Sequence, residues 1–178
     1  MRKLIGVGTM VALASCVSAP PKPAPAPPAP DPRPAPALPA APPRQDWRDV
    51  PLSPGRWLWR GGAGQASLSQ FGMPGTPADF ALRCDMPRAT IVFSRAGSLG
   101  AGVATGMTVT TSFGTFAIPA RDGGGAPPAI LAELPARDPR LDQMAFSRGR
   151  ILIDIPGQPR LVLPSWPEAA RVIEDCRG

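Results

Sequence analysis

The chain has 178 residues and is basic overall, with 19 Lys and Arg against 13 Asp and Glu. It contains no histidine, and no lysine follows Lys22. These absences exclude nucleophilic triads and dyads built on histidine or lysine, Schiff-base lysines and histidine metal sites.

The first fifteen residues are typical of an export signal. Arg2 and Lys3 precede an apolar run at 4–13, and small residues follow it. The run is about half of the roughly 20 residues that a transmembrane helix needs. We therefore expect residues 1–15 to be a signal peptide and not a membrane span.

Residues 13–16, Leu-Ala-Ser-Cys, resemble the bacterial lipobox. The resemblance implies that Cys16 becomes the acylated first residue of the mature protein, held at a membrane by its lipid. We expect the outer membrane, on the side that faces the periplasm. The alternative is an ordinary secretory signal that is cut near Ala19.

Residues 16–44 are expected to consist of the acylated Cys16 and a linker rich in proline and alanine. Within it, residues 17–44 contain 13 prolines in 28 residues, and proline supplies no backbone donor for a helix or a sheet. We expect an extended spacer of up to about 85 Å, at roughly 3.1 Å per residue. The alternative is a proline-rich ligand for the groove of a partner.

Residues 45–178 are predicted to be a single folded domain, in which 14 arginines are nearly balanced by 12 acidic residues. The balance gives no support to nucleic-acid binding. We expect an α+β fold: a mostly antiparallel β-sheet or partly closed barrel of about seven to eight strands, with a C-terminal helix.

Alternating apolar residues predict the strands in the first half of the domain. Trp57 and Trp59 should share one face of the first strand, and Ala66 and Leu68 should point inward from the second. The strand that carries Ile91, Val92 and Phe93 should be buried on both sides. These strands are predicted at 56–60, 65–71, 79–84 and 89–95.

Two glycine-rich stretches, 97–106 and 121–128, are predicted to be flexible loops. The first lacks the third glycine of a dinucleotide fingerprint and the Lys-Ser/Thr pair of a P-loop, so we expect no phosphate site there. Between them, residues 107–118 should form a hairpin closed by residues 111–114. Residues 130–134 fit either a short strand or a helical turn.

Near the end of the chain, two strands at 151–155 and 161–163 should form a second hairpin. The sequence Pro-Gly-Gln-Pro at 156–159 suits a type II turn. The expected register makes the two apolar faces coincide. It pairs Ile155 with Leu161 and Ile153 with Leu163.

Two helices flank this hairpin. Asp138 as N-cap and Pro139 at the first position predict a short helix, on which Leu141, Met144 and Ala145 should share one side. Residues 165–168, Ser-Trp-Pro-Glu, predict a capping box for the final helix. The residues of its apolar stripe fall at helical spacing. They are Ala169, Val172, Ile173 and Cys176.

The two remaining cysteines should form a disulfide. Cys84 ends an alternating strand, and Cys176 ends the apolar stripe of the last helix. In an exported chain such a pair is most economically a disulfide. The loop that it closes has about 90 residues, which corresponds to roughly 4 to 5 kcal/mol of stabilisation in the chain-entropy model.

The end of the domain also resembles known proteins. The segment from Asp138 through residues 145–150 (Ala-Phe-Ser-Arg-Gly-Arg) to residues 171–177 resembles the tail of uncharacterised lipoproteins of alphaproteobacteria. The order of elements, from a Trp-x-Trp strand to a helix ending in cysteine, is more loosely similar to the invasion-associated locus B family. The first resemblance implies an envelope location and this fold class, and it carries no assigned activity.

Carboxylates are the remaining candidates for catalysis. Asp138 and Asp142 lie four residues apart on a predicted helix, and Glu133 is nearby in the sequence, so a paired-acid hydrolase is formally open. Carboxylates at a helix start are more often caps. We therefore expect no enzyme, no metal and no cofactor.

Ser147, Arg148 and Arg150 are a candidate anion-binding site. We expect Arg148 and Arg150 to lie on one strand face, where their guanidinium groups could grip a phosphate or a carboxylate. The alternative is that they only keep a strand edge soluble.

The sequence thus predicts a lipid-anchored periplasmic binding or accessory module of the cell envelope, without catalysis. Its expected partners are the membrane, through Cys16, and an envelope protein or an anionic envelope ligand. The alternative is an inhibitor of an envelope-degrading enzyme, similar to lysozyme-inhibitor lipoproteins. An inhibitor would insert a loop, 97–106 or 121–128, into the cleft of the enzyme.

Overall fold

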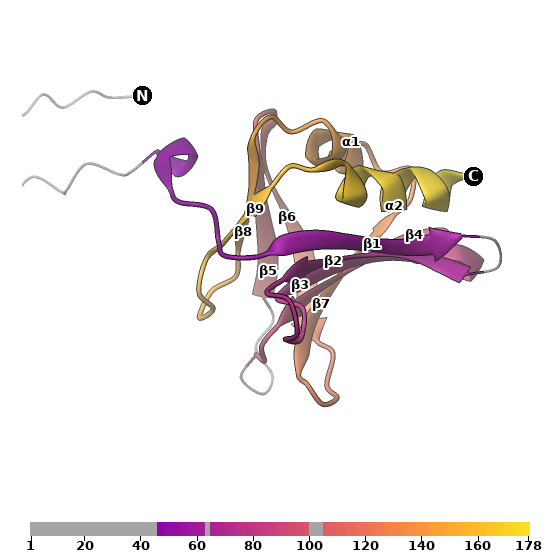
Figure 1. Ribbon diagram of the computed structural model, residues 1–178, viewed down its shortest axis with the longest axis horizontal. Coiled ribbons are helices and arrows are strands. Elements are labelled where there is room, and N and C mark those ends of the chain that lie inside the picture. The colour runs from indigo at the N-terminus through magenta and orange to yellow at the C-terminus, as the bar shows by residue number, and fades with distance from the viewer. Residues whose placement is uncertain (1–45, 63–64, 100–104) are drawn as a thin grey trace, which may run out of the picture. The chain divides into compact units, whose positions relative to one another are not determined.

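The computed structural model describes residues 46–62, 65–99 and 105–178. The expected signal peptide, Cys16 and the linker lie outside this part of the chain, as does the centre of the first glycine-rich loop. The described residues form nine strands, two α-helices and two short 3-10 helices (Figure 1). In chain order the elements are η1 (Trp47–Asp49), β1 (Arg56–Gly62), β2 (Gln65–Gly72), β3 (Phe80–Asp85), η2 (Met86–Arg88), β4 (Thr90–Ala96), β5 (Thr105–Thr111), β6 (Gly114–Asp122), β7 (Ala129–Pro135), α1 (Pro139–Ala145), β8 (Arg150–Asp154), β9 (Leu161–Pro164) and α2 (Pro167–Arg177).

The strands form one antiparallel sheet in the order β1-β2-β3-β4-β7-β6-β5-β8-β9. The sheet curls into a half-barrel, and α2 runs alongside β1 (Figure 1). The expected α+β class, antiparallel sheet and C-terminal helix are confirmed, with slightly more strands than expected. The ambiguous stretch 130–134 lies within β7, because β4 and β6 pair with it on both sides.

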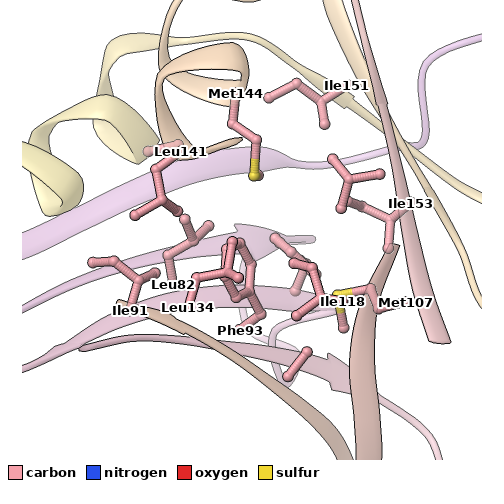
Figure 2. Packing of buried hydrophobic residues seen from close by; sticks show 14 of the residues in the cluster. Leu82, Ile91, Phe93, Met107, Ile118, Leu134, Leu141, Met144, Ile151 and Ile153 are labelled. Carbon is pink, nitrogen blue, oxygen red and sulfur yellow. The ribbon is translucent and has the colours of Figure 1, made fainter. Parts of the chain in front are cut away.

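The concave face of the sheet holds the apolar core. Leu82 of β3 lies opposite Phe93 of β4, and both are fully buried. Val92, on the other face of β4, is only 5% exposed, so this strand is buried on both sides as predicted. Figure 2 shows Leu141 and Met144 reaching from α1 into the same cluster. The core thus lies between the curled sheet and its helices.

The inward face of β2 differs from the prediction. Ser67, Ser69 and Phe71 are buried, whereas Ala66 is exposed and Leu68 is half-buried. The reason is that α2 lies close over this strand and places a polar partner there, since the Ser67 hydroxyl donates to Asp175 at 2.5 Å. A small hydroxyl side chain fits beneath a helix where a leucine would need more room.

The register of the second hairpin is shifted by two residues from the predicted one. A type II turn forms, with Pro156 and Gly157 at its centre, a φ of +80° at Gly157 and a 3.0 Å bond from the Gln158 amide to the Ile155 carbonyl. Pro159 has no amide to donate, so strand pairing stops before the turn. The apolar faces still coincide, because a shift of two residues keeps each side chain on its face. The observed pairs are Ile151 with Leu163 and Ile153 with Leu161.

The predicted capping box of α2 is wrong. The helix begins at Pro167, so Trp166 occupies the N-cap position and makes no capping hydrogen bond with its side chain. Ser165 lies one residue too early, and its hydroxyl donates instead to the carbonyl of Ser147. Proline is favoured at the first helical position, where it needs no amide partner. The apolar stripe itself is confirmed. Its buried residues are Ala169, Val172, Ile173 and Cys176.

Two other local predictions are confirmed. Asp138 caps α1 by accepting from the Arg140 amide at 2.9 Å, and Leu141 and Met144 are buried. The β5–β6 hairpin closes with Thr111 opposite Gly114, as the sequence predicted.

The two edge strands of the sheet are joined at one end. The Ser53 amide donates to the Val162 carbonyl at 2.9 Å, just before β1 begins. The Trp57 indole N–H donates to the Pro164 carbonyl of β9 at 2.8 Å. These bonds bring β1 and β9 together beside the start of α2.

Candidate functional site

The last turn of α2 is covalently joined to the end of β3. Cys84 and Cys176 form a disulfide with their Cα atoms 5.4 Å apart, which lies within the usual range of 4.4 to 6.8 Å. The bond links residues 92 positions apart in the sequence. The predicted pairing is confirmed, and α2 is held over the first strands of the sheet.

A cleft of about 940 Å³ lies between the C-terminal half of α2 and strands β1 to β3. Its volume is near the upper end of the roughly 300 to 1,000 Å³ typical of ligand sites. The disulfide contributes Cys84 to its lining. The side chains that give the cleft its chemistry are Trp59, Ser67, Arg83, Met86, Arg171 and Asp175.

Polar contacts tie α2 to the strands beneath it. The guanidinium carbon of Arg171 lies 3.5 Å from the centre of the Trp59 ring, a close cation–π contact. The indole N–H of Trp59 donates to the Ser67 hydroxyl at 2.9 Å, and that hydroxyl donates to the Asp175 carboxylate at 2.5 Å. One wall of the cleft therefore consists of side chains that fix one another.

The cleft carries charges of both signs. Arg83 and Arg171 line it together with Asp85, Glu174 and Asp175. A hydrogen bond from the Arg88 side chain keeps the pKa of Asp85 below its usual value, so this carboxylate is charged at neutral pH. The site therefore presents donors and acceptors to a ligand in about equal measure.

The sequence prediction missed this cleft. Arg171 and Asp175 are four residues apart and so lie on one side of α2, beside its apolar stripe, which is a signal that the sequence contains. Their partner on the sheet is Ser67. The expectation that Ala66 and Leu68 point inward placed this serine on the wrong face.

The carboxylates considered for catalysis do not line the cleft, and each is paired with arginine. Hydrogen bonds from Arg140 and Arg88 hold the pKa values of Asp138 and Glu133, respectively, below their usual range. A general acid needs the opposite shift. The pairs are Asp138 with Arg140 at 2.8 Å, Asp142 with Arg177 at 2.7 Å, and Glu133 with Arg88 at 2.7 Å and Arg121 at 2.9 Å.

The residues of the candidate anion site do not share a strand face. Arg148 lies before β8, which begins at Arg150. The Arg150 guanidinium donates to the Val50 carbonyl. Ser147 is buried, and its hydroxyl accepts from the Ser112 amide at 3.1 Å and donates to the Arg150 carbonyl at 2.9 Å. These hydrogen bonds join neighbouring segments of the chain. Arg148 is exposed, whereas Arg150 is half-buried.

Comparison of the chain with protein-family models, curated proteins and solved structures finds no match. Neither helix within 46–62, 65–99 and 105–178 is long and apolar enough to cross a membrane. The same residues contain no group of three or more cysteine and carboxylate side chains that could hold a metal ion.

Proposed function

We propose that the chain is a lipid-anchored, non-catalytic binding module of the cell envelope, and that it holds its partner in the cleft beside α2. The observation that carries this proposal is the cleft itself. It has the volume of a ligand site, and its wall is built from Trp59, Arg171 and Asp175, which fix one another. Side chains held in this way need little further ordering on binding.

The charge pattern favours a protein segment as the partner. Two arginines and three acidic residues line the cleft, so a simple anion would meet repulsion as well as attraction. A polypeptide can place its own charges opposite both kinds of group, which favours specificity. The partner we propose is therefore an exposed segment of an envelope protein.

The anchor is tested separately from the cleft. Because acylation requires the thiol of Cys16, Cys16→Ser should release the protein from the membrane fraction or leave it unprocessed. Unchanged fractionation and migration would contradict the anchor and would leave the proposal for the cleft standing.

Site-specific crosslinking in cells tests the cleft. A photoreactive amino acid replaces Met86, which lines the cleft and is 55% exposed, or Phe113, which lies in the β5–β6 turn and is 57% exposed. We expect a discrete protein adduct from position 86 and none from position 113. Absence of an adduct at 86, or equal adducts at both positions, would contradict the proposal.

The inhibitor alternative predicts a different result from the same experiment. It places the contact on one of two loops, 97–106 or 121–128, and the second lies between β6 and β7, where Ala126 is exposed. An adduct formed only from position 126, with an envelope-degrading enzyme as the captured protein, would favour inhibition over the proposed function.

A further inference from the structure

Strand β1 has a second face, which the cleft does not use. Trp57 and Trp59 point toward the core and α2, whereas the residues between and beside them point outward. This outward face carries Arg56, Leu58 and Arg60, two cations with an apolar side chain between them. Leu58 is 44% exposed.

The outward face forms the floor of a groove of about 300 Å³. The segment 73–78, which connects β2 to β3, forms its other side. The Thr76 amide and hydroxyl both donate to the Met73 carbonyl, at 3.2 and 2.8 Å, so this segment is folded as a turn. Met73 is 50% exposed and lines the groove, which adds a second apolar side chain to it.

The charged residues that line the groove are all positive. Its lining contains Arg56 and Arg60 and no acidic residue. Neither arginine makes an ion pair within the described residues, in contrast to Arg88 and Arg140, which are each bound to carboxylates. Unpaired guanidinium groups next to apolar surface offer both a charge and a hydrophobic contact.

We propose that this groove binds an anionic amphiphile, a molecule with a phosphate or carboxylate head and an apolar chain. Arg56 and Arg60 would bind the head through charge-assisted hydrogen bonds. Leu58 and Met73 would contact the chain. A volume of about 300 Å³ is at the lower end for ligand sites, so the groove holds the head and only the first part of the chain. The inference is independent of the cleft beside α2.

Photolabelling of the full chain in a neutral detergent tests the proposal. The probes are decyl phosphate and decanoate with a photoreactive group in the chain, and decyl maltoside with the same chain as the neutral control. We expect the anionic probes to label segment 73–78 and the neutral probe to label it weakly. Whichever anionic probe labels more strongly identifies the head that the groove prefers.

Matched variants separate the groove from general charge effects. Arg56→Gln with Arg60→Gln should reduce labelling at least about tenfold, because two charge-assisted contacts are lost. Arg137→Gln with Arg160→Gln makes the same change in net charge outside the groove and should leave labelling unchanged. Leu58→Asn should also weaken labelling by decyl phosphate. All these side chains, Leu58 included, are exposed, so unchanged melting temperatures serve as the control for folding.

Three results would overturn the inference. One is equal labelling of the wild type and the Arg56/Arg60 variant. Another is equal labelling by the neutral probe. The third is competition by inorganic phosphate as strong as competition by unlabelled decyl phosphate, which would mean that the apolar chain contributes nothing.

Discussion

The two helices are held to the same sheet by different means. The seven-residue helix α1 has a side-chain cap from Asp138 and buries two apolar residues. The eleven-residue helix α2 has no side-chain cap, buries a full apolar stripe and ends in the disulfide. Thus the position of α1 is set by its cap and its own buried residues. The position of α2, and with it one wall of the cleft, also depends on a bond to a cysteine 92 positions earlier in the chain.

The largest expected effect is the loss of the disulfide. Replacing both Cys84 and Cys176 by alanine should lower the free energy of unfolding by about 4 to 5 kcal/mol, because the unfolded chain regains the freedom of a loop this long. Urea denaturation of the oxidised protein and the double variant measures the difference. A loss below about 1 kcal/mol would contradict this chain-entropy origin of the stabilisation.

The next effect concerns the apolar contact of α1. Leu141 is fully buried, so Leu141→Ala should cost about 3 kcal/mol through lost burial and the cavity that remains. The control is Gln143→Ala on the same helix, which should change stability by less than about 0.5 kcal/mol. Equal effects of the two variants in urea denaturation would show that α1 is held by its cap and not by the core.

The cap of α1 should give a smaller and pH-dependent effect. Asp138→Ala should cost about 1 to 2 kcal/mol at neutral pH. The Arg140 hydrogen bond lowers the pKa of Asp138 below the reference value of 3.8, so the stabilisation is present above about pH 4 and is lost as the pH falls further.

The variant Asp138→Asn separates the cap from the charge. Asparagine can still cap the helix, so at pH 7 this variant should lose less than Asp138→Ala. Its difference from the wild type should shrink as the pH falls toward 3, and thermal denaturation at a series of pH values measures it. A difference that does not change with pH would contradict the role of the carboxylate charge.

The smallest effect tests the polar contacts beneath α2. Ser67→Ala removes the bonds to Trp59 and Asp175 and should cost about 1 kcal/mol. The matched control is Ser69→Ala, since the Ser69 hydroxyl is buried without a hydrogen-bond partner in the described part of the chain. That variant should be neutral or slightly stabilising. If Ser69→Ala lowered the melting temperature more than Ser67→Ala, the role of the Ser67 hydroxyl in the cleft wall would be contradicted.

The fold could be predicted from the sequence where one residue type decides a local structure. Asp138 followed by proline predicted the start of α1. The position of Cys176 on the apolar stripe of the last helix predicted its disulfide with Cys84. The prediction failed where a distant element decides. Ser67 points inward because α2 supplies Asp175. Ser165 does not cap α2 because the helix begins only at Pro167, and its hydroxyl donates instead to the carbonyl of the distant Ser147.

Buried charge is a second limit of prediction from sequence. Arg95 looks like a polar residue at the end of a strand, yet it is only 8% exposed. Its guanidinium donates to the carbonyls of Asp79, Ala96 and Pro159. No local pattern indicates that these three carbonyls meet. The cleft was not predicted for the same reason, because the elements that line it, α2 and strands β1 to β3, come from opposite ends of the domain.

The central claim is that the disulfide holds α2 as the wall of the cleft, and amide hydrogen exchange before and after reduction tests it most directly. In the oxidised protein the amides of α2 should be protected to a similar degree as those of α1 and the central strands. After reduction the amides of α2 should exchange much faster, because α2 loses its covalent link to β3 and a helix of eleven residues does not persist apart from the sheet. Those of α1 should stay protected, because its cap and its buried Leu141 and Met144 do not depend on the disulfide. Unchanged protection of α2, or equal loss in both helices, would contradict the claim.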